Sequence, residues 1–222
     1  MEAVNRWMAV LSLALSACGS SEVPLPSVVS VAPPSMAANE SILLAVNLDQ
    51  APPPKFDYGN SSAELPTSAR VSIGEQEFDI LQVEEQGKRL VVELPPGMPV
   101  GPQEFEVTFA DGRKATFESG FEVKPPLNIT GLSIDPITTQ IRLRPFTIRI
   151  RVAGPDAELF QGRVKLSTSK GTISPAVSGP FSRGLRTQEV VLDDTGGSNV
   201  TITVEDYAGL SFTSGDFRLN PN

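Results

Sequence analysis

Few side chains in this 222-residue sequence have the chemistry that a catalytic site needs. The sequence contains one Cys and no His. The absence of His removes the usual general base near neutral pH and the commonest ligand of transition metals. A serine nucleophile would then depend on a lysine or carboxylate base, and no serine lies in a recognisable strand-to-helix turn. The sequence therefore predicts that the protein is not an enzyme and uses no catalytic cofactor.

Two pairs of neighbouring carboxylates are the candidates for metal binding. They are Asp193 with Asp194, and Glu205 with Asp206. Clustered carboxylate oxygens are the ligands that Ca²⁺ selects. Asp at the start of a loop also commonly hydrogen-bonds nearby backbone and closes a turn. Because the spacing of these residues fits no known calcium loop, we favour the turn role, and a calcium site is the weaker alternative.

The single thiol, Cys18, follows a short apolar segment. Arg6 supplies a positive charge, and residues 7–17 are then apolar or small. A membrane-spanning helix needs about 20 apolar residues, whereas the apolar region of a signal peptide has about 7–15. The sequence after Cys18 becomes polar and contains Pro. Residues 1–17 are therefore predicted to be a signal peptide.

Leu15-Ser16-Ala17-Cys18 closely resembles the lipobox of bacterial lipoproteins. The resemblance implies cleavage before Cys18 and attachment of a diacylglyceryl group to its sulfur, and this acyl lipid is the only covalent group we expect. One acyl chain binds a membrane only marginally, whereas two or three hold a protein on it. The resemblance implies export and anchoring to the cell envelope, and Gly19-Ser20 favours the outer membrane. The alternative is an ordinary secretory signal with a chance cysteine.

The charge of the chain excludes one class of partner. The formal net charge is −8, with 18 Lys and Arg against 26 Asp and Glu. Nucleic-acid binding depends on Lys and Arg that neutralise phosphates, so no nucleic-acid partner is expected. The expected partners are a membrane, through the lipid, and a protein of the cell envelope. Residues 18–27, rich in Ser, Pro and Glu, are predicted to form a short flexible tether after the lipidated Cys.

Apolar residues beyond the tether recur at every second position. Such runs lie at 42–48, 71–73, 105–109, 146–152, 164–168 and 200–204. This period predicts strands with one buried face, and the 18 Gly and 20 Pro indicate many turns between them. Asp111-Gly112 is a strong hairpin signal, because a tight primed turn needs the positive φ that Gly tolerates.

The first strand-rich unit, residues 28–123, resembles the IPT/TIG family of immunoglobulin-like folds. The similar segments are Val29–Pro34, Val71–Gly74, Leu90–Gly97, Gly101–Thr108 and Gly120–Val123. The chain departs from the family pattern at Asn39-Glu40-Ser41, which replaces a typically Gly-rich turn, and at Ala51–Asn60, which is longer than the usual connection. Proline cannot donate a ladder hydrogen bond, so Lys124-Pro125-Pro126 is predicted to be the linker 124–126 that ends this unit.

The long connection contains the best candidate for partner binding. Pro52-Pro53-Pro54 should stiffen the chain as polyproline II. Phe56 and Tyr58 follow it, and two aromatic rings on a loop tip could anchor a partner. The alternative is that both rings fold back and cover an open end of the sandwich.

The second unit, residues 127–222, resembles bacterial Ig-like domains of the invasin type, through Gly162–Pro175 and Asn199–Asp206. The predicted fold is therefore all-β, with two consecutive immunoglobulin-like β-sandwich domains after the signal peptide and tether. The expected function is a non-enzymatic, membrane-anchored spacer or protein-binding and adhesion module. Alternatives are an accessory subunit of an envelope or outer-membrane complex and, third, a carbohydrate-binding module.

Overall fold

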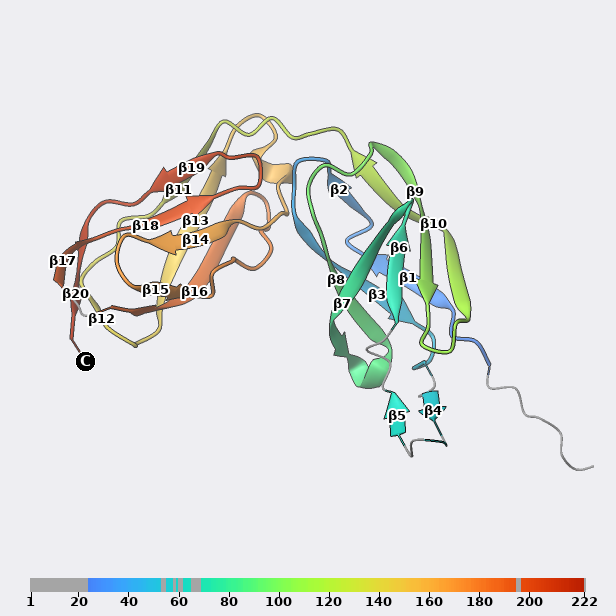
Figure 1. The fold of residues 1–222 in the computed structure, drawn as a ribbon. Helices are drawn as coiled ribbons and strands as arrows, with labels where there is room; N and C mark the ends of the chain where they lie inside the picture. The colour runs from blue at the N-terminus through green and yellow to red at the C-terminus, as the bar shows by residue number, and fades with distance from the viewer. Residues whose placement is uncertain are drawn as a thin grey trace, which may run out of the picture.

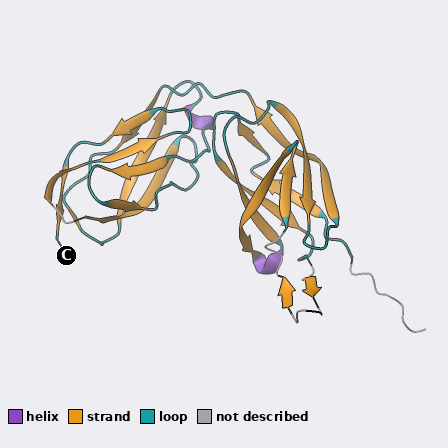
Figure 2. Ribbon diagram, viewed as in Figure 1, coloured by secondary structure: helices purple, strands orange, loops and turns teal. Residues whose placement is uncertain are grey.

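The computed structural model describes residues 24–52, 55–57, 59, 62–64, 69–194 and 197–221, and these form a protein of β-strands. The helical segments among them are single 3-10 turns, η2 (Glu85–Gly87) and η3 (Ala157–Leu159). No helix in the described part of the chain is long and apolar enough to cross a membrane. Figure 2 shows two strand-rich bodies that meet at one end. The predicted all-β fold of two consecutive sandwiches is confirmed.

The first sandwich is one continuous set of eight strands. They are β1 (Val28–Ala32), β2 (Ser35–Ala37), β3 (Ile42–Leu48), β6 (Arg70–Ile73), β7 (Gln76–Glu84), β8 (Arg89–Leu94), β9 (Gly101–Thr108) and β10 (Lys114–Lys124), in the order β1-β3-β8-β7-β6-β9-β10-β2. Strand β7 pairs with β6 through its first half and with β8 through its second half, so it belongs to both layers. Strand β1 pairs with β3, whereas the next strand, β2, pairs with β10. The chain therefore changes layer between β1 and β2.

Alternation of apolar residues explains how these strands form a core. The side chains of Leu44 and Val46 on β3 have no exposed surface. Val71 on β6 and Val107 on β9 are also fully buried and belong to the same core cluster. Complete burial of such a side chain stabilises the fold by about 1.5–3 kcal/mol. The runs at 42–48, 71–73 and 105–109 therefore supply the interior of the first sandwich.

The second sandwich has a separate apolar core. Its strands are β11 (Gly131–Ile134), β12 (Gln140–Ile141), β13 (Phe146–Ala153), β14 (Lys165–Thr168), β15 (Thr172–Ser174), β16 (Leu185–Asp193), β17 (Gly197–Val200), β18 (Ile202–Glu205), β19 (Ser211–Thr213) and β20 (Phe217–Asn220). They form sheets in the orders β11-β13-β16-β15, β14-β18-β19 and β12-β20-β17. Strand β13 shows the expected period, because Ile148, Ile150 and Val152 are buried while the residues between them are exposed. The core residues all come from the range 132–219.

Two connections in the first sandwich differ in detail from the expectation. The hairpin at Asp111-Gly112 is present, but only Gly112 has positive φ, 82°. A primed type I′ turn needs positive φ at both central residues, so the turn is of another type. Gly112 N and Phe109 N donate to the oxygens of Phe109 and Arg113, both at 2.8 Å, and close a longer loop. In addition, β10 extends to Lys124, the first residue of the predicted linker.

The long connection predicted as a loop contains a hairpin. Strands β4 (Lys55–Asp57) and β5 (Ser62–Glu64) pair antiparallel, with Phe56 opposite Ala63. Figure 1 shows this hairpin projecting from the end of the first sandwich that lies away from the second. The first described residues, which lead into β1, enter at the same end.

Candidate functional site

The lipid and partner residues predicted from the sequence are only partly described. Residues 1–17, Cys18 and Tyr58 lie outside the described residues. Phe56 lies on β4, where its backbone pairs with that of Ala63. The structure therefore places one of the two predicted aromatic anchors on a projecting hairpin.

The predicted carboxylate candidates for calcium have other partners. Asp193 Oδ1 lies 2.7 Å from the Arg142 Nη2, and Glu205 Oε1 lies 3.2 Å from the Lys165 Nζ. Asp206 Oδ1 accepts hydrogen bonds from two backbone N–H groups of its own loop, those of residues 208 and 210, at 2.9 and 2.7 Å. Among the described residues, no group of three or more carboxylate, Cys or His side chains could hold a metal ion.

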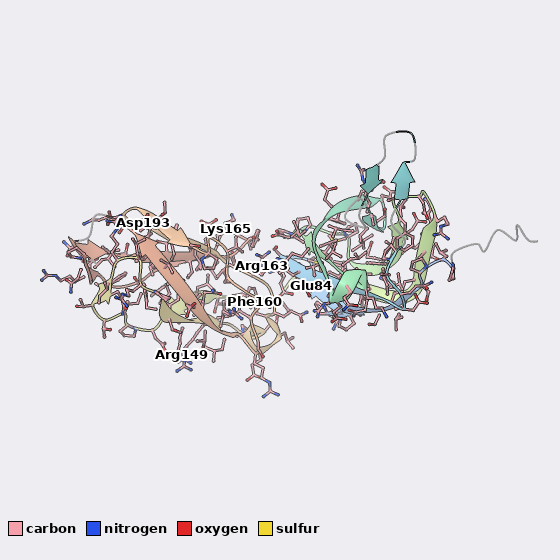
Figure 3. The ribbon with its side chains drawn as sticks, turned by 90° about the horizontal axis from the view of Figure 1, so that it is seen from below. Glu84, Arg149, Phe160, Arg163, Lys165 and Asp193 are labelled. Atoms are coloured by element: carbon pink, nitrogen blue, oxygen red, sulfur yellow. The ribbon has the colours of Figure 1, made fainter. Side chains whose placement is uncertain are left out.

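The structure brings together a set of residues that make polar contacts, through side chains or backbone, where the two sandwiches meet. We call this set the interdomain joint, and its members are Ser35, Asn39, Glu40, Ser41 and Glu93 of the first sandwich and Leu127, Gln161, Gly162, Arg163 and Tyr207 of the second. Figure 3 shows Arg163 and Phe160 on the part of the second sandwich that faces the first. None of these residues was predicted to be functional.

Glu40 is the centre of the joint. It lies in the turn between β2 and β3, and only 2% of its surface is exposed. One carboxylate oxygen, Oε2, accepts a hydrogen bond from Ala37 N at 2.9 Å within the same turn. The other, Oε1, accepts from Gln161 N at 2.8 Å and Gly162 N at 2.9 Å. A buried carboxylate is costly unless its oxygens are paired, and here both accept backbone N–H groups.

Hydrogen bonds that involve backbone continue around Glu40. Asn39 and Leu127 pair twice, since Leu127 N donates to Asn39 Oδ1 at 2.8 Å and Asn39 Nδ2 donates to Leu127 O at 3.0 Å. Gln161 Nε2 donates to Ser35 O at 2.8 Å, and Arg163 N donates to Ser41 O at 2.9 Å. Bonds to backbone define the position of one sandwich against the other, because the backbone cannot change rotamer.

An ion pair completes the joint beside Glu40. Arg163 Nη1 lies 3.0 Å from Glu93 Oε1, and the Arg163 side chain is only 13% exposed. The atoms are close but not aligned for a hydrogen bond, so we treat the contact as an ion pair. Ser41 Oγ donates to the same Glu93 oxygen at 3.2 Å, and Arg163 Nε donates to Ser178 O at 3.1 Å. Partial burial reduces the solvent screening of this pair.

Apolar side chains lie beside the polar contacts of the joint. The rings of Phe160 and Phe181 pack edge to face with centroids 5.1 Å apart, and both are buried in the second sandwich. Grooves of about 400 and 440 Å³ lie beside Phe181, one lined also by Val91 and the other by Met36 of the first sandwich.

The chemistry of the joint is that of attachment between domains. The Glu40 carboxylate accepts backbone N–H groups, and the Glu93 carboxylate pairs with Arg163 and accepts the Ser41 hydroxyl. Sequence reasoning missed the joint because the partners of Glu40 are main-chain atoms 121 and 122 residues away. One signal did point to it, since Asn39-Glu40-Ser41 stands where the resemblance drawn from the sequence leads one to expect a Gly-rich turn.

No protein-family model and no curated protein matches this chain. Among solved structures, the chain is similar to the Yersinia pseudotuberculosis adhesin InvE, with 14% identity and a TM-score of 0.37 over 86% of this chain and 58% of that one. It is also similar to the D0-D1 domain of Intimin, with 14% identity and a TM-score of 0.35 over 86% of this chain and 96% of that one. Domains 4 and 5 of the S-layer protein SbsC match with 14% identity and a TM-score of 0.33 over 87% and 92%.

Proposed function

We propose that this chain is a non-enzymatic lipoprotein of the cell envelope whose two sandwiches form one rigid, bent spacer or protein-binding module. The observation that carries the proposal is the buried Glu40 carboxylate of the first sandwich, which accepts two backbone N–H groups of the second. Domains within a chain move relative to one another by default, so a rigid arrangement needs specific contacts that hold it. A joint of this kind supports a spacer, because a spacer works by holding a fixed geometry.

The anchor in this proposal is lipid on Cys18. The chain from Pro24 onward is attached to the first sandwich, since Ser27 N donates to Asp49 Oδ1 at 2.8 Å and Gln50 Nε2 donates to Pro24 O at 3.1 Å. The six residues from Cys18 to Pro24 can span about 20 Å at most. A lipid on Cys18 would therefore keep the first sandwich close to the membrane surface.

The anchor is tested by the mass of the mature protein made in a bacterial host. We expect cleavage before Cys18 and a mass increase that corresponds to a diacylglyceryl group and one further acyl chain. A Cys18→Ser variant, processed as a soluble protein or left uncleaved, is the control. An unmodified thiol on Cys18, or cleavage at another residue, would refute the lipoprotein assignment.

The β4–β5 hairpin favours the more specific alternative of an accessory subunit in an envelope complex. It projects from the first sandwich, so Phe56 and Tyr58 are proposed to contact a protein partner. Replacing both with Ala should abolish co-purification of a stoichiometric partner and leave the unfolding transition unchanged. A lost unfolding transition would instead show that the rings cover the end of the sandwich.

A further inference from the structure

The end of the second sandwich away from the joint carries two exposed apolar side chains in one turn. Residues 141–144, which we call the distal turn, are the last residue of β12 and the first three residues of its connection to β13. Ile141 is 44% exposed and Leu143 is 48% exposed. They are only two residues apart, whereas the other large exposed apolar side chains in the described part of the chain are spread over both sandwiches. The distal turn therefore exposes two neighbouring apolar side chains on a protein whose net charge is negative.

The backbone of the distal turn is held in an uncommon conformation. Leu143 has φ of 59°, in the left-handed region that a residue with a branched side chain rarely adopts. Its N–H donates to Leu192 O at 2.9 Å, and the neighbouring N–H groups of Arg142 and Arg144 donate to Asn220 O and Ile141 O at 2.9 and 3.2 Å. Strained residues of this kind persist where the surrounding structure holds them, and they are frequent at binding sites.

Positive charge accompanies the apolar side chains. Arg142 is neutralised by Asp193, with Nη2 and Oδ1 2.7 Å apart. Arg144 is exposed and forms no ion pair with any residue that the structure describes. An apolar pair beside an Arg that has no ion pair within the described part of the chain complements the interface of an anionic bilayer, where acyl chains lie beneath negative headgroups.

The bend at the joint places the distal turn on the side of the molecule where the chain begins. In Figure 1, β12 lies at the free end of the second sandwich, and the bend turns this end toward the side from which the β4–β5 hairpin projects and the first described residues enter. In Figure 3, Asp193, the partner of Arg142, lies at the opposite end of the second sandwich from Arg163. A surface beneath the molecule could thus meet both ends.

We propose that the distal turn is a second membrane contact, in which Ile141 and Leu143 enter the headgroup region of an anionic phospholipid surface and Arg144 lies against phosphate. The inference rests on the proposed lipid attachment at Cys18. A tether converts the second contact into an intramolecular event at high effective concentration, so the contact needs less affinity of its own than a free protein would need. The protein would then lie along the membrane on two points instead of standing on one.

A single tryptophan can report this contact. The sequence has one Trp, Trp7, within the predicted signal peptide, so the chain from Cys18 onward contains none. We would couple that chain through Cys18 to a maleimide phospholipid in phosphatidylcholine–phosphatidylglycerol vesicles that contain brominated lipid. Trp in I141W should be quenched and blue-shifted. Trp in L159W, at a position 64% exposed near the joint, should not be.

Two further variants keep the test decisive. L143G suits the positive φ and removes the apolar side chain. Combined with I141W, it should lower the ratio of membrane-bound to free distal turns about fivefold, because roughly half of the leucine side chain would otherwise be buried in the membrane. R144E should reduce quenching on anionic vesicles. If I141W itself fails to fold, L143W serves as the reporter.

Equal quenching of Trp at positions 141 and 159 would overturn the proposal. A co-purified protein that covers the distal turn and prevents quenching by the lipid would also overturn it. Because Cys18 is coupled chemically, this result does not depend on lipidation in the cell. The mass of the mature protein tests that step separately. Failure of the membrane contact and failure of the lipoprotein assignment are therefore distinguishable.

Discussion

Glu40→Ala should loosen the angle between the two sandwiches without unfolding either core. The substitution removes the acceptor of three backbone N–H groups, those of Ala37, Gln161 and Gly162. Glu40 contributes no apolar surface to the core clusters, so both cores should remain intact. The effect should therefore concentrate at the joint.

The size of the effect follows from the three hydrogen bonds. Each bond to a charged group contributes about 1.5–3 kcal/mol, or about 4.5–9 kcal/mol together. These values already include the desolvation of the carboxylate, and they do not add fully, because water reaches the freed N–H groups once the joint opens. The net loss is then about 2–4 kcal/mol. Once the joint opens, water can pair with the freed N–H groups, so the loss should appear mainly as domain motion.

Paired spin labels measure this motion directly. In a Cys18→Ser background, Cys can be introduced at Thr116 of the first sandwich and Thr147 of the second, both of which are exposed on strands. We expect one narrow interlabel distance distribution for the parent protein and a broad one for Glu40→Ala. Urea unfolding followed by circular dichroism should show the accompanying loss of stability.

Glu158→Ala is the matched control. Glu158 is exposed, lies beside the same joint in the groove next to Phe160, and its loss changes the charge by the same amount. Its distance distribution should match that of the parent. If Glu40→Ala also left the distribution narrow and the urea midpoint unchanged, the rigid-spacer argument would fail.

Three further predictions concern the second sandwich. The Arg151 guanidinium donates a hydrogen bond to Asp135 and lowers the pKa of that carboxyl below 3.8. The contribution of this pair to stability is therefore present above pH 3.8 and lost as the pH falls through the lower pKa of the folded state. An NMR titration of Asp135 should show the lowered pKa. Gly171→Ala should destabilise by about 1–3 kcal/mol in urea, because φ is +67° and a Cβ would lie 2.2 Å from Asp193 O. Leu143→Gly should raise the thermal midpoint, with a gain of about 0.5–1 kcal/mol from relief of the positive φ.

Each of these has a control or a contrary result. Arg151→Gln should return the pKa of Asp135 toward its ordinary value, and no change would mean that the ion pair is absent in solution. Gly209 also has positive φ but no atom within 4 Å of a Cβ, so Gly209→Ala should cost less than Gly171→Ala. A lower midpoint for Leu143→Gly would show that packing of the side chain outweighs its backbone strain.

The strands were predictable because their signal is local. Burial of alternate residues in β3 and β13 follows from the two-residue period of an extended chain, and that period is visible in the sequence. The β4–β5 hairpin was not predicted, because its short strands have no comparable alternation. Leu143 also gave no signal, since its positive φ is imposed by hydrogen bonds from the surrounding strands.

The sequence by itself determined that this is an all-β protein of two sandwiches, and it made Cys18 the candidate for lipid attachment. Both conclusions depend on patterns that neighbouring residues carry. Only the tertiary structure decided what Glu40 does, because its partners are the N–H groups of residues 161 and 162, which any residue except proline would supply. The bend between the domains is likewise a property of atoms that meet in space, and no local pattern encodes it.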